Sequence, residues 1–281
     1  MTIELAPITD ADIAEVADFL HANYKKEIPW ARSRLAEPWK VDAPNHGFIL
    51  RDGRRIVGAH LAFYSERLVA GRLERFCDLG TWYVLPEFRF HSLSILKALL
   101  EQDGYQFITL SPADNTVSII TWLGFRHLDA SACLIPNLPW PTPPSRTTIS
   151  ADPDVIGSTL TGTELQRYRD HAEALAAHHM VLIRGRDSCY VVYRKTRAKG
   201  MPIAVIAHAS NPALFRRAVI PLTRHLLVRH RLLATLADLR IIGRRPPLSF
   251  SVTSWPKMYL SDSLEPELID DLYSESLCIP W

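Results

Sequence analysis

The sequence has 281 residues, of which 47% are hydrophobic, and its 32 Lys and Arg residues nearly balance 30 Asp and Glu residues to leave a net charge of +2. This length suits one large domain or two of about 140 residues, and we favour two. The small net charge excludes a strong overall attraction to nucleic acid or to membranes, no apolar run approaches the ~18 residues of a membrane span, and the N-terminus lacks the features of a signal peptide. We therefore expect a cytoplasmic protein.

The first half of the chain predicts helices and strands in mixed order. A Thr or Asp that can cap a helix precedes the first apolar helical pattern. The pair Asp52-Gly53 between two apolar runs is typical of a β-hairpin. The expected elements are a strand at residues 3–6, a helix within 9–24, a hairpin over 46–67, a strand at 73–85, a helix at 92–102, a strand at 106–112, a short helix through Trp122 and a strand near 126–135.

A proline-rich stretch at residues 133–148 follows, and its proline density is expected to exclude a helix or a central strand. It divides the chain into two expected domains, residues 1–136 and 149–281, joined by a linker at 137–148. Because the first domain lacks an evident final strand, we expect "KMYLSD" at residues 257–262 to complete a sheet in one domain or the other.

The second half repeats the order of the first in outline. "FILRDGR" and "VLIRGRD" occupy equivalent hairpin positions, which favours two weak copies of one fold. The expected elements are a helix within residues 161–179, a hairpin over 180–195, a strand at 203–209, a long helix from Ala213 and a strand at 232–239.

The stretch "VLPEFRFHSLSILKALL", residues 84–100, predicts a strand end, a short loop and an amphipathic helix that buries Leu93, Leu96 and Leu100. The free N–H groups and the positive dipole end of a helix can hold a phosphate at such a place, and Arg89 would add a charge-assisted contact. The alternative is that Ser92 only caps the helix and that Arg89 is a solvated surface residue.

This strand, loop and helix resemble the acyl-CoA loop of the GCN5-related N-acetyltransferase (GNAT) superfamily, whose usual form is Arg or Gln, two residues, Gly, one residue, and Gly or Ala. The resemblance extends over residues 3–135 and includes "WLGF" at 122–125, which is similar to the family's Leu-Gly-Phe ending. Ser92 and Ser94 depart from the pattern, since they stand at its glycine positions. The resemblance implies an α+β fold with a mixed central sheet flanked by helices, here as two similar domains in tandem with a degenerate second copy.

The resemblance also implies a co-substrate, acetyl-CoA or another acyl-CoA. In the family its thioester arm lies between two strands that splay apart, so the backbone of Val84 and Leu85 would bind the arm. Asn115 matches a position that contacts the pantetheine, although it is equally suited to be a plain helix N-cap. The loop residues that would hold the CoA are Arg89, Phe90, His91, Ser92, Leu93 and Ser94.

Acyl transfer to an amine needs a base that takes a proton from the ammonium group. Asp78 stands six residues before Val84, the spacing at which the superfamily's histone-modifying members carry a glutamate base. In a regular strand this even count puts both residues on one face, unless a bulge intervenes. The alternative role for Asp78 is a salt bridge with Arg75 or Arg89, and Glu66 is the second candidate base.

Three aromatic residues on predicted strands, Tyr64, Trp82 and Tyr83, are candidates for the acceptor pocket, although strand aromatics are also typical of a core. Many relatives carry a Tyr that serves as the general acid five residues before the Phe of Leu-Gly-Phe, and here that position is Ile120. Either Tyr64, Tyr83 or His91 substitutes, or the thiolate leaves unassisted, or the first copy handles a different chemistry.

Residues 197–245 contain ten Lys or Arg and a single acid. Arg217, Arg224 and Arg231 recur every seven residues, which predicts a basic stripe along one helix. The stripe is a candidate grip for an anionic acceptor or an acyl carrier. The alternative is neutralisation within the chain, because residues 262–275 carry six acids and no base.

The cysteines lie far apart, with neither a Cys-x-x-Cys pair nor a nearby His at metal-ligand spacing. We therefore expect no disulfide and no metal, and reduced, mostly buried thiols. The four residues are Cys77, Cys133, Cys189 and Cys278.

The sequence thus favours an acyl-CoA-dependent N-acyltransferase, an acetyltransferase in the first instance, that acts on a primary amine of a small metabolite. One alternative is a non-enzymatic acyl-CoA-binding protein. Another is an acyltransferase that takes its acyl group from an acyl carrier protein or an aminoacyl-tRNA. We expect no membrane partner and no nucleic-acid partner, and a homodimer is left open.

Overall fold

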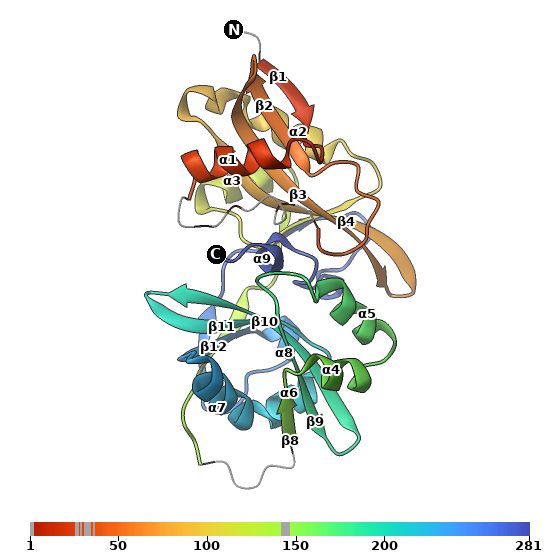
Figure 1. The fold of residues 1–281 in the computed structure, drawn as a ribbon, viewed down its shortest axis with the longest axis vertical. Coiled ribbons are helices and arrows are strands. Elements are labelled where there is room, and N and C mark those ends of the chain that lie inside the picture. The colour runs from red at the N-terminus through yellow and green to blue at the C-terminus, as the bar shows by residue number, and fades with distance from the viewer. Residues whose placement is uncertain (1–2, 26–27, 29, 31–34, 36, 142–146) are drawn as a thin grey trace. The chain divides into compact units, whose positions relative to one another are not determined.

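In a computed structural model of the protein, the residues described are 3–25, 28, 30, 35, 37–141 and 147–281. The chain forms two compact units, each built from more than one stretch of the sequence (Figure 1). The first unit comprises Met1–Leu128, Pro256–Leu268 and Tyr273–Trp281, and the second comprises Asp129–Trp255 and Ile269–Leu272.

The first unit contains a mixed sheet that has seven strands within the described residues, in the order β1-β2-β3-β4-β5-β14-β6. Neighbouring strands are antiparallel, apart from the parallel pair β4 and β5. The strands are β1 (Ile3–Pro7), β2 (Gly47–Asp52), β3 (Arg55–Val69), β4 (Arg72–Val84), β5 (Gln106–Thr109), β6 (Arg126–His127) and β14 (Met258–Leu260). The helices are α1 (Ile13–Asn23), α2 (Ser92–Leu100), α3 (Asp114–Trp122) and α9 (Glu275–Cys278), with 3₁₀ helices η2 (Pro86–His91) and η3 (Pro266–Leu268).

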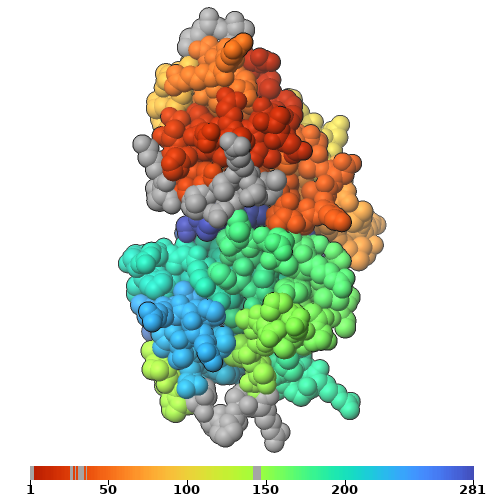
Figure 2. Space-filling model, viewed as in Figure 1, coloured from red at the N-terminus to blue at the C-terminus, as the bar shows by residue number. Residues whose placement is uncertain are grey.

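Helices cover both faces of this first sheet. On one face, α2 and α3 bury Leu96 and Ile120 against strand residues such as Phe107. On the other face, Phe19 of α1 contacts Tyr83 of β4, with 6.0 Å between the ring centroids. Figure 2 shows α1, in dark red, on the outer surface of this unit. β3 and β4 are therefore central strands, because apolar side chains of α2 and α3 pack on one face of the sheet and those of α1 pack on the other.

The second unit contains a sheet of seven strands within the described residues, in the order β13-β7-β12-β11-β10-β9-β8, with β11 and β12 as its parallel pair. The strands are β7 (Ser131–Pro136), β8 (Thr147–Ser150), β9 (His178–Arg184), β10 (Asp187–Ala198), β11 (Met201–Ala209), β12 (Ala234–Asp238) and β13 (Phe250–Thr253). The helices are α4 (Pro153–Thr159), α5 (Gly162–His171), α6 (Pro212–Arg217), α7 (Val219–His230) and α8 (Leu239–Ile242).

The core of the second unit lies between this sheet and the helices α6, α7 and α8. Phe215, Leu222 and Ile242 are buried there against strand residues such as Val191. The two sheets have the same succession of strands, because β1 to β5 correspond in order and direction to β8 to β12. The expected arrangement of two mixed sheets in tandem is therefore confirmed.

Each unit completes its sheet with a strand from the other half of the sequence. β6 ends at His127 in the first sheet and β7 begins at Ser131, yet β7 lies between β12 and β13 of the second sheet. Conversely, β13 ends at Thr253 in the second sheet and β14 begins at Met258, between β5 and β6 of the first. The expectation that residues 257–262 complete a sheet is confirmed, and the exchange is reciprocal.

The proline-rich stretch differs from its expected form. Its first four residues form the end of β7, which has a neighbour on each side. A central strand is tolerated here because only Pro136 falls within β7, at its last residue, where a missing N–H costs little. Residues 142–146 of the expected linker lie outside the described residues. The structural units therefore do not divide at the expected positions 136 and 149.

The long helix expected from Ala213 is broken into α6 and α7 at Ala218. Arg217 is the last residue of α6 and Arg231 follows the end of α7 in a left-handed conformation, with a φ of 56°. The expected stripe of three arginines on one helix is therefore wrong, because a helix break separates Arg217 from Arg224.

Candidate active site

β4 and β5 separate at one end of the first sheet. Their parallel pairing covers Phe76, Cys77 and Asp78 of β4 and ends there. From Leu79 to Val84, β4 still pairs with β3 on one side, and on the other side no strand of the described chain pairs with it. Such an open edge can accept an extended chain through its backbone N–H and C=O groups.

A β-bulge lies at the start of this open edge. His60 and Ala62 of β3 stand opposite Trp82 and Leu79 of β4, so three steps along β4 match two along β3. Between these two pairs, β4 has two residues, at positions 80 and 81, where β3 has one. A bulge of this kind bends the strand and changes the direction in which the following side chains point.

The bulge shifts the alternation of side chains along β4. Leu79 and Trp82, three residues apart, both pack into the core under α2. Asp78 and Thr81, also three residues apart, both contact Glu275 of α9. Val84 follows the alternation of Trp82, so Asp78 and Val84 lie on opposite faces. The shared face expected for a regular strand is therefore absent, because the bulge that was the stated alternative is present.

Two buried acidic residues, Asp78 and Glu275, lie beside the bulge. Asp78 is only 2% exposed, and its Oδ2 accepts the backbone N–H of Glu275 at 2.8 Å. Glu275 is 5% exposed, and its Oε1 accepts the Thr81 backbone N–H at 2.8 Å and the Thr81 hydroxyl at 2.6 Å. A side chain at Gly80 would place its Cβ 3.0 Å from Glu275 Oε1 and 3.0 Å from the Phe63 ring. A larger residue at this position would force the carboxylate or the ring to move by a few tenths of an ångström, so glycine suits this close approach.

Burial raises the pKa of Glu275 to about 7, although the hydrogen bonds from Thr81 and the charge of Lys25 act in the opposite direction. A carboxyl group with such a pKa gains and loses its proton near neutral pH, as a general base must. The nearby Tyr24 phenol is affected in turn, since burial and then the Glu275 charge raise its pKa.

The predicted anion-binding loop at residues 84–94 is more helical than expected. η2 runs directly into α2, and the backbone N–H of Ser92 donates to the Arg89 carbonyl. The Ser94 hydroxyl donates to the His91 carbonyl at 2.7 Å, and no side chain caps α2 at its start. Ser92 is therefore not the helix cap, and its N–H is not open to an anion.

The side chains of this loop nevertheless face outward. Arg89 is exposed and forms no ion pair with any carboxylate of the described chain. Phe90 is 78% exposed, and Leu93, which was expected to be buried, is 40% exposed. The helix buries Leu96, as expected, together with Ile95 and Leu99, because η2 turns the start of α2 away from the core.

No protein-family model matches the sequence, and no curated protein matches it. Solved structures do match the fold over most of the chain. A GCN5-related N-acetyltransferase from Anabaena variabilis ATCC 29413 is 10% identical with a TM-score of 0.56, and the match covers 92% of this chain and 72% of that one. Another from Kribbella flavida is 14% identical with a TM-score of 0.56, covering 92% and 70%. The N-myristoyltransferase of Saccharomyces cerevisiae, solved with bound myristoyl-CoA and inhibitors, is 10% identical with a TM-score of 0.51, covering 98% and 86%.

The chain has the GCN5-related N-acetyltransferase fold. In this N-acetyltransferase fold, the first unit carries the splayed pair β4 and β5 that the resemblance implied. Val84 is the last residue of β4 and lies on the open edge. The Leu85 N–H is already engaged, because it donates to the Val57 carbonyl at 2.9 Å. Val84 and Leu85 were both expected to bind the thioester arm. Only Val84 lies on the part of β4 whose outer edge is unpaired.

The second candidate base, Glu66, lies at the far end of the β3–β4 hairpin of this N-acetyltransferase fold. It is exposed, pairs with Arg75 across the strands and lies 3.8 Å from the Arg75 Nε. Arg75 precedes Val84 by a stretch of strand that spans about 30 Å. The structure therefore does not bring Glu66 together with the open edge, and the Arg75 partner that was considered for Asp78 belongs to Glu66.

The three aromatic candidates for the acceptor pocket do not converge. Tyr64 is fully buried, and its hydroxyl donates to Asn45 Oδ1 at 2.7 Å. Trp82 stacks on His60 on the face under α2, with ring centroids 5.0 Å apart. Tyr83 lies on the opposite face against α1. Tyr64 is thus a core residue, whereas Trp82 and Tyr83 are half-buried beside the open edge.

Asn115 is the second residue of α3 and is exposed, so it is not the helix N-cap, a position that Ala113 takes. Glu275 was not singled out from the sequence, because it lies 197 positions from Asp78 and carries no motif. In the sequence, Glu275 belongs to the acidic segment at residues 262–275, for which neutralisation of the basic segment is the hypothesis. Part of that hypothesis is confirmed, since Arg240 pairs with Asp271.

The four cysteines are buried, as expected, and their thiols are free. Among the residues that the structure describes, no group of three His, Cys, Asp or Glu could hold a metal ion. Within the same residues, no helix is long and apolar enough to cross a membrane.

Proposed function

We propose that the protein is an N-acyltransferase that moves the acyl group of an acyl-CoA to the primary amine of a small metabolite. The observation that carries this proposal is the open edge of β4 beside the buried pair of carboxylates, Asp78 and Glu275. The fold supports it, because solved N-acetyltransferases and an N-myristoyltransferase share the fold.

The thioester arm of the donor would lie along residues 79–84 as an added strand, with the backbone of Val84 among its partners. Arg89 would bind the CoA phosphates, and the exposed Phe90 and Leu93 would cover apolar parts of the donor. His91, Ser92, Ser94 and Asn115 complete the surface that we propose for the donor.

In the transfer step, the amine nitrogen attacks the thioester carbonyl carbon. The C–N bond forms and the C–S bond breaks, so the electron pair of the C–S bond leaves with the CoA thiolate, which then takes a proton from solvent. The ammonium proton passes to a base, and we place this base in the Asp78–Glu275 pair. Backbone N–H groups at the open edge would stabilise the oxyanion.

Within the pair, Glu275 is the carboxylate that we expect to hold the proton, directly or through one water. Its pKa of about 7 matches this task, and its partners on Thr81 are uncharged donors. Asp78, the base expected from the sequence, would then position α9 through its bond to the Glu275 N–H. Trp82 and Tyr83, one on each face of β4, are the side chains that we propose for contact with the acceptor, with Tyr64 supporting them from the core.

The test is release of free thiol from acetyl-CoA and from longer acyl-CoA species, measured with a panel of primary amines and with a mass-spectrometric screen of cell extract for acylated products. Thiol release that depends on one class of amine supports the proposal. CoA binding without thiol release for any amine would instead support a non-enzymatic acyl-CoA-binding protein. Transfer from an acyl carrier protein or aminoacyl-tRNA alone would assign a different donor.

A further inference from the structure

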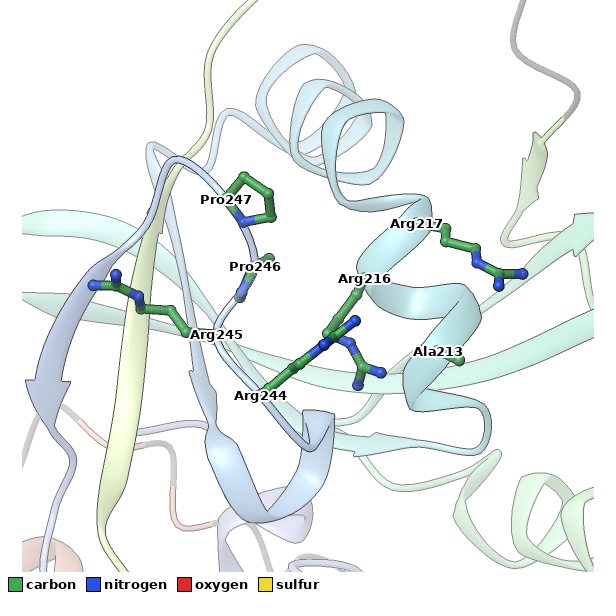
Figure 3. A pocket seen from close by; sticks show the side chains of 7 residues that line it. All are labelled: Ala213, Arg216, Arg217, Arg244, Arg245, Pro246 and Pro247. Carbon is green, nitrogen blue, oxygen red and sulfur yellow. The ribbon is translucent and has the colours of Figure 1, made fainter.

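A pocket of about 530 Å³ in the second unit is lined by four arginines (Figure 3). Arg216 and Arg217 come from the end of α6, and Arg244 and Arg245 come from the loop after α8. The remaining lining residues are small or apolar and include Pro246 and Pro247. Figure 3 shows Arg216 and Arg244 extending toward each other, while Arg217 and Arg245 point outward on either side.

The backbone positions Arg216 at the pocket. Its guanidinium donates to the Ile242 carbonyl at the end of α8. Gly243, which follows, has a φ of 79°, and a Cβ at this position would come within 3.0 Å of Arg216 Nη1. Glycine therefore permits both the left-handed turn and the close approach of the guanidinium to the chain.

None of the four arginines forms an ion pair with a carboxylate within the described part of the chain. The single acid of residues 197–245 is Asp238, which lies 3.6 Å from the Arg240 Nε. Arg245 donates to the Ser251 hydroxyl, an uncharged partner. Guanidinium groups that share one pocket repel each other, and an anion bound between them would remove this repulsion.

We propose that this pocket binds the phosphate groups of a small phosphate-bearing molecule. Planar guanidinium groups match phosphate oxygens in a bidentate geometry, and Arg216 and Arg244 converge on one point. The volume is within the range of about 300–1,000 Å³ that small-molecule sites occupy. The two prolines offer an apolar wall for the rest of such a ligand. All lining residues belong to the second unit, so the site is separate from the one proposed for acyl transfer.

The test is isothermal titration calorimetry of the full-length protein with inorganic pyrophosphate at moderate salt. We expect one pyrophosphate to bind per pocket and Arg244→Ala to weaken the binding about tenfold or more. Arg244 is exposed and has no protein partner among the described residues, so its removal should leave the fold intact, which a thermal melt checks. Arg186→Ala, at an exposed arginine in the β9–β10 turn, is the matched control and should bind as the wild type does.

Arg89→Ala separates this site from the loop of the first unit, because it should leave pyrophosphate binding to the pocket unchanged. Binding that is lost in Arg89→Ala and kept in Arg244→Ala, or no binding at all, would overturn the proposal. Competition with ATP and with CoA identifies the kind of phosphate-bearing molecule. A single-stranded oligonucleotide that binds through Arg244 while free pyrophosphate and nucleotides do not would also overturn it, in favour of a nucleic-acid site.

Discussion

Asp78 and Glu275 are 197 positions apart in the sequence, and Asp78 Oδ2 accepts the backbone N–H of Glu275 at 2.8 Å. This bond joins the middle of β4 to the first residue of α9. The same segment brings the Glu275 carboxylate against Thr81 at the bulge. The proposed base is therefore positioned by the end of the chain and held by a strand of its first half.

Glu275→Gln should lower the rate of thiol release by about 10²–10⁴-fold and leave CoA affinity nearly unchanged, because the amide keeps the size and loses the proton acceptor. The loss should shrink at high pH, where more of the amine is already deprotonated. The measurement is kcat with a saturating amine, together with a CoA titration. Turnover close to that of the wild type would leave Glu275 without a role in proton transfer.

Asp78→Asn should lower the rate by a smaller factor, about tenfold, because the amide oxygen can still accept the Glu275 N–H while the charge is lost. The same kinetic assay compares the two variants. If Asp78→Asn costs the larger factor and Glu275→Gln the smaller, Asp78 itself takes the proton and the roles within the pair are reversed.

Glu275 should make folding less favourable as the pH rises from about 4.5 to about 7. Burial raises its pKa from the usual 4.5 to about 7, so in this window the folded state holds a proton that the unfolded state has lost. The stabilising contribution is therefore fully present below pH 4.5 and is gone above pH 7. The shift corresponds to about 3 kcal/mol in the free energy of unfolding.

Urea unfolding of the wild type and of Glu275→Gln across this pH range measures that contribution. The wild type should lose stability relative to the variant as the pH rises, since glutamine cannot titrate. A difference that stays constant from pH 4.5 to pH 7 would mean that the folded protein does not hold the proton.

Arg89→Ala should weaken acyl-CoA binding by about 1.5–3 kcal/mol if a charged hydrogen bond to phosphate is lost. Arg72→Ala is the matched control, because Arg72 is also exposed but lies at the start of β4, away from η2. Calorimetry with CoA compares the two. Equal affinities for both variants would place the CoA phosphates elsewhere.

A fragment of residues 1–146 should be insoluble or melt without cooperativity, because it lacks β14 and α9. Without β14, β5 and β6 have no strand between them and the buried Met258 and Tyr259 are missing from the core. The measurement is a thermal melt followed by circular dichroism. A cooperative melt would show that the first half folds without the C-terminal segment.

The matched comparison is a chain in which residues 3–128 are joined to residues 257–281 by Asn-Gly. Leu128 donates its N–H to the Lys257 carbonyl at 2.9 Å, so a two-residue turn can close this pair into a hairpin. This rearranged chain should melt cooperatively, since it restores β14 beside β6. If it fails as the fragment does, strand exchange is not the reason for the failure.

Local sequence patterns predicted most elements of the fold. The Asp52-Gly53 turn predicted the β2–β3 hairpin. The spacing of apolar residues predicted α1 and α2 close to their observed bounds. These signals depend on residues that are near each other in the chain. Local sequence patterns do not predict the exchange of β7 and β14. β7 follows β6 closely in the chain and β14 follows β13, so a prediction from local patterns would place each strand in the same sheet as the one before it.

The candidate site was predictable only in part. The position of β4 and of the open edge followed from the order of elements, whereas the bulge depends on how β3 pairs with β4 around Gly80. Glu275 could not be found from the sequence, since its burial and its raised pKa arise only when α9 packs on β4. In the sequence alone, Glu275 cannot be distinguished from an acidic surface residue, because its partners on β4 are distant in the chain.

From the exchange of strands we also expect a reversal of the usual order of folding during synthesis. Domains generally fold as they emerge from the ribosome, the N-terminal one first. Here the first sheet cannot close until β14, which begins at Met258, has been made, whereas β7 to β13 emerge as one continuous run. The second unit is thus ready to fold while β5, with Phe107 and Ile108, still presents an unpaired edge. We therefore expect the nascent N-terminal half to expose this edge until β14 has been synthesised.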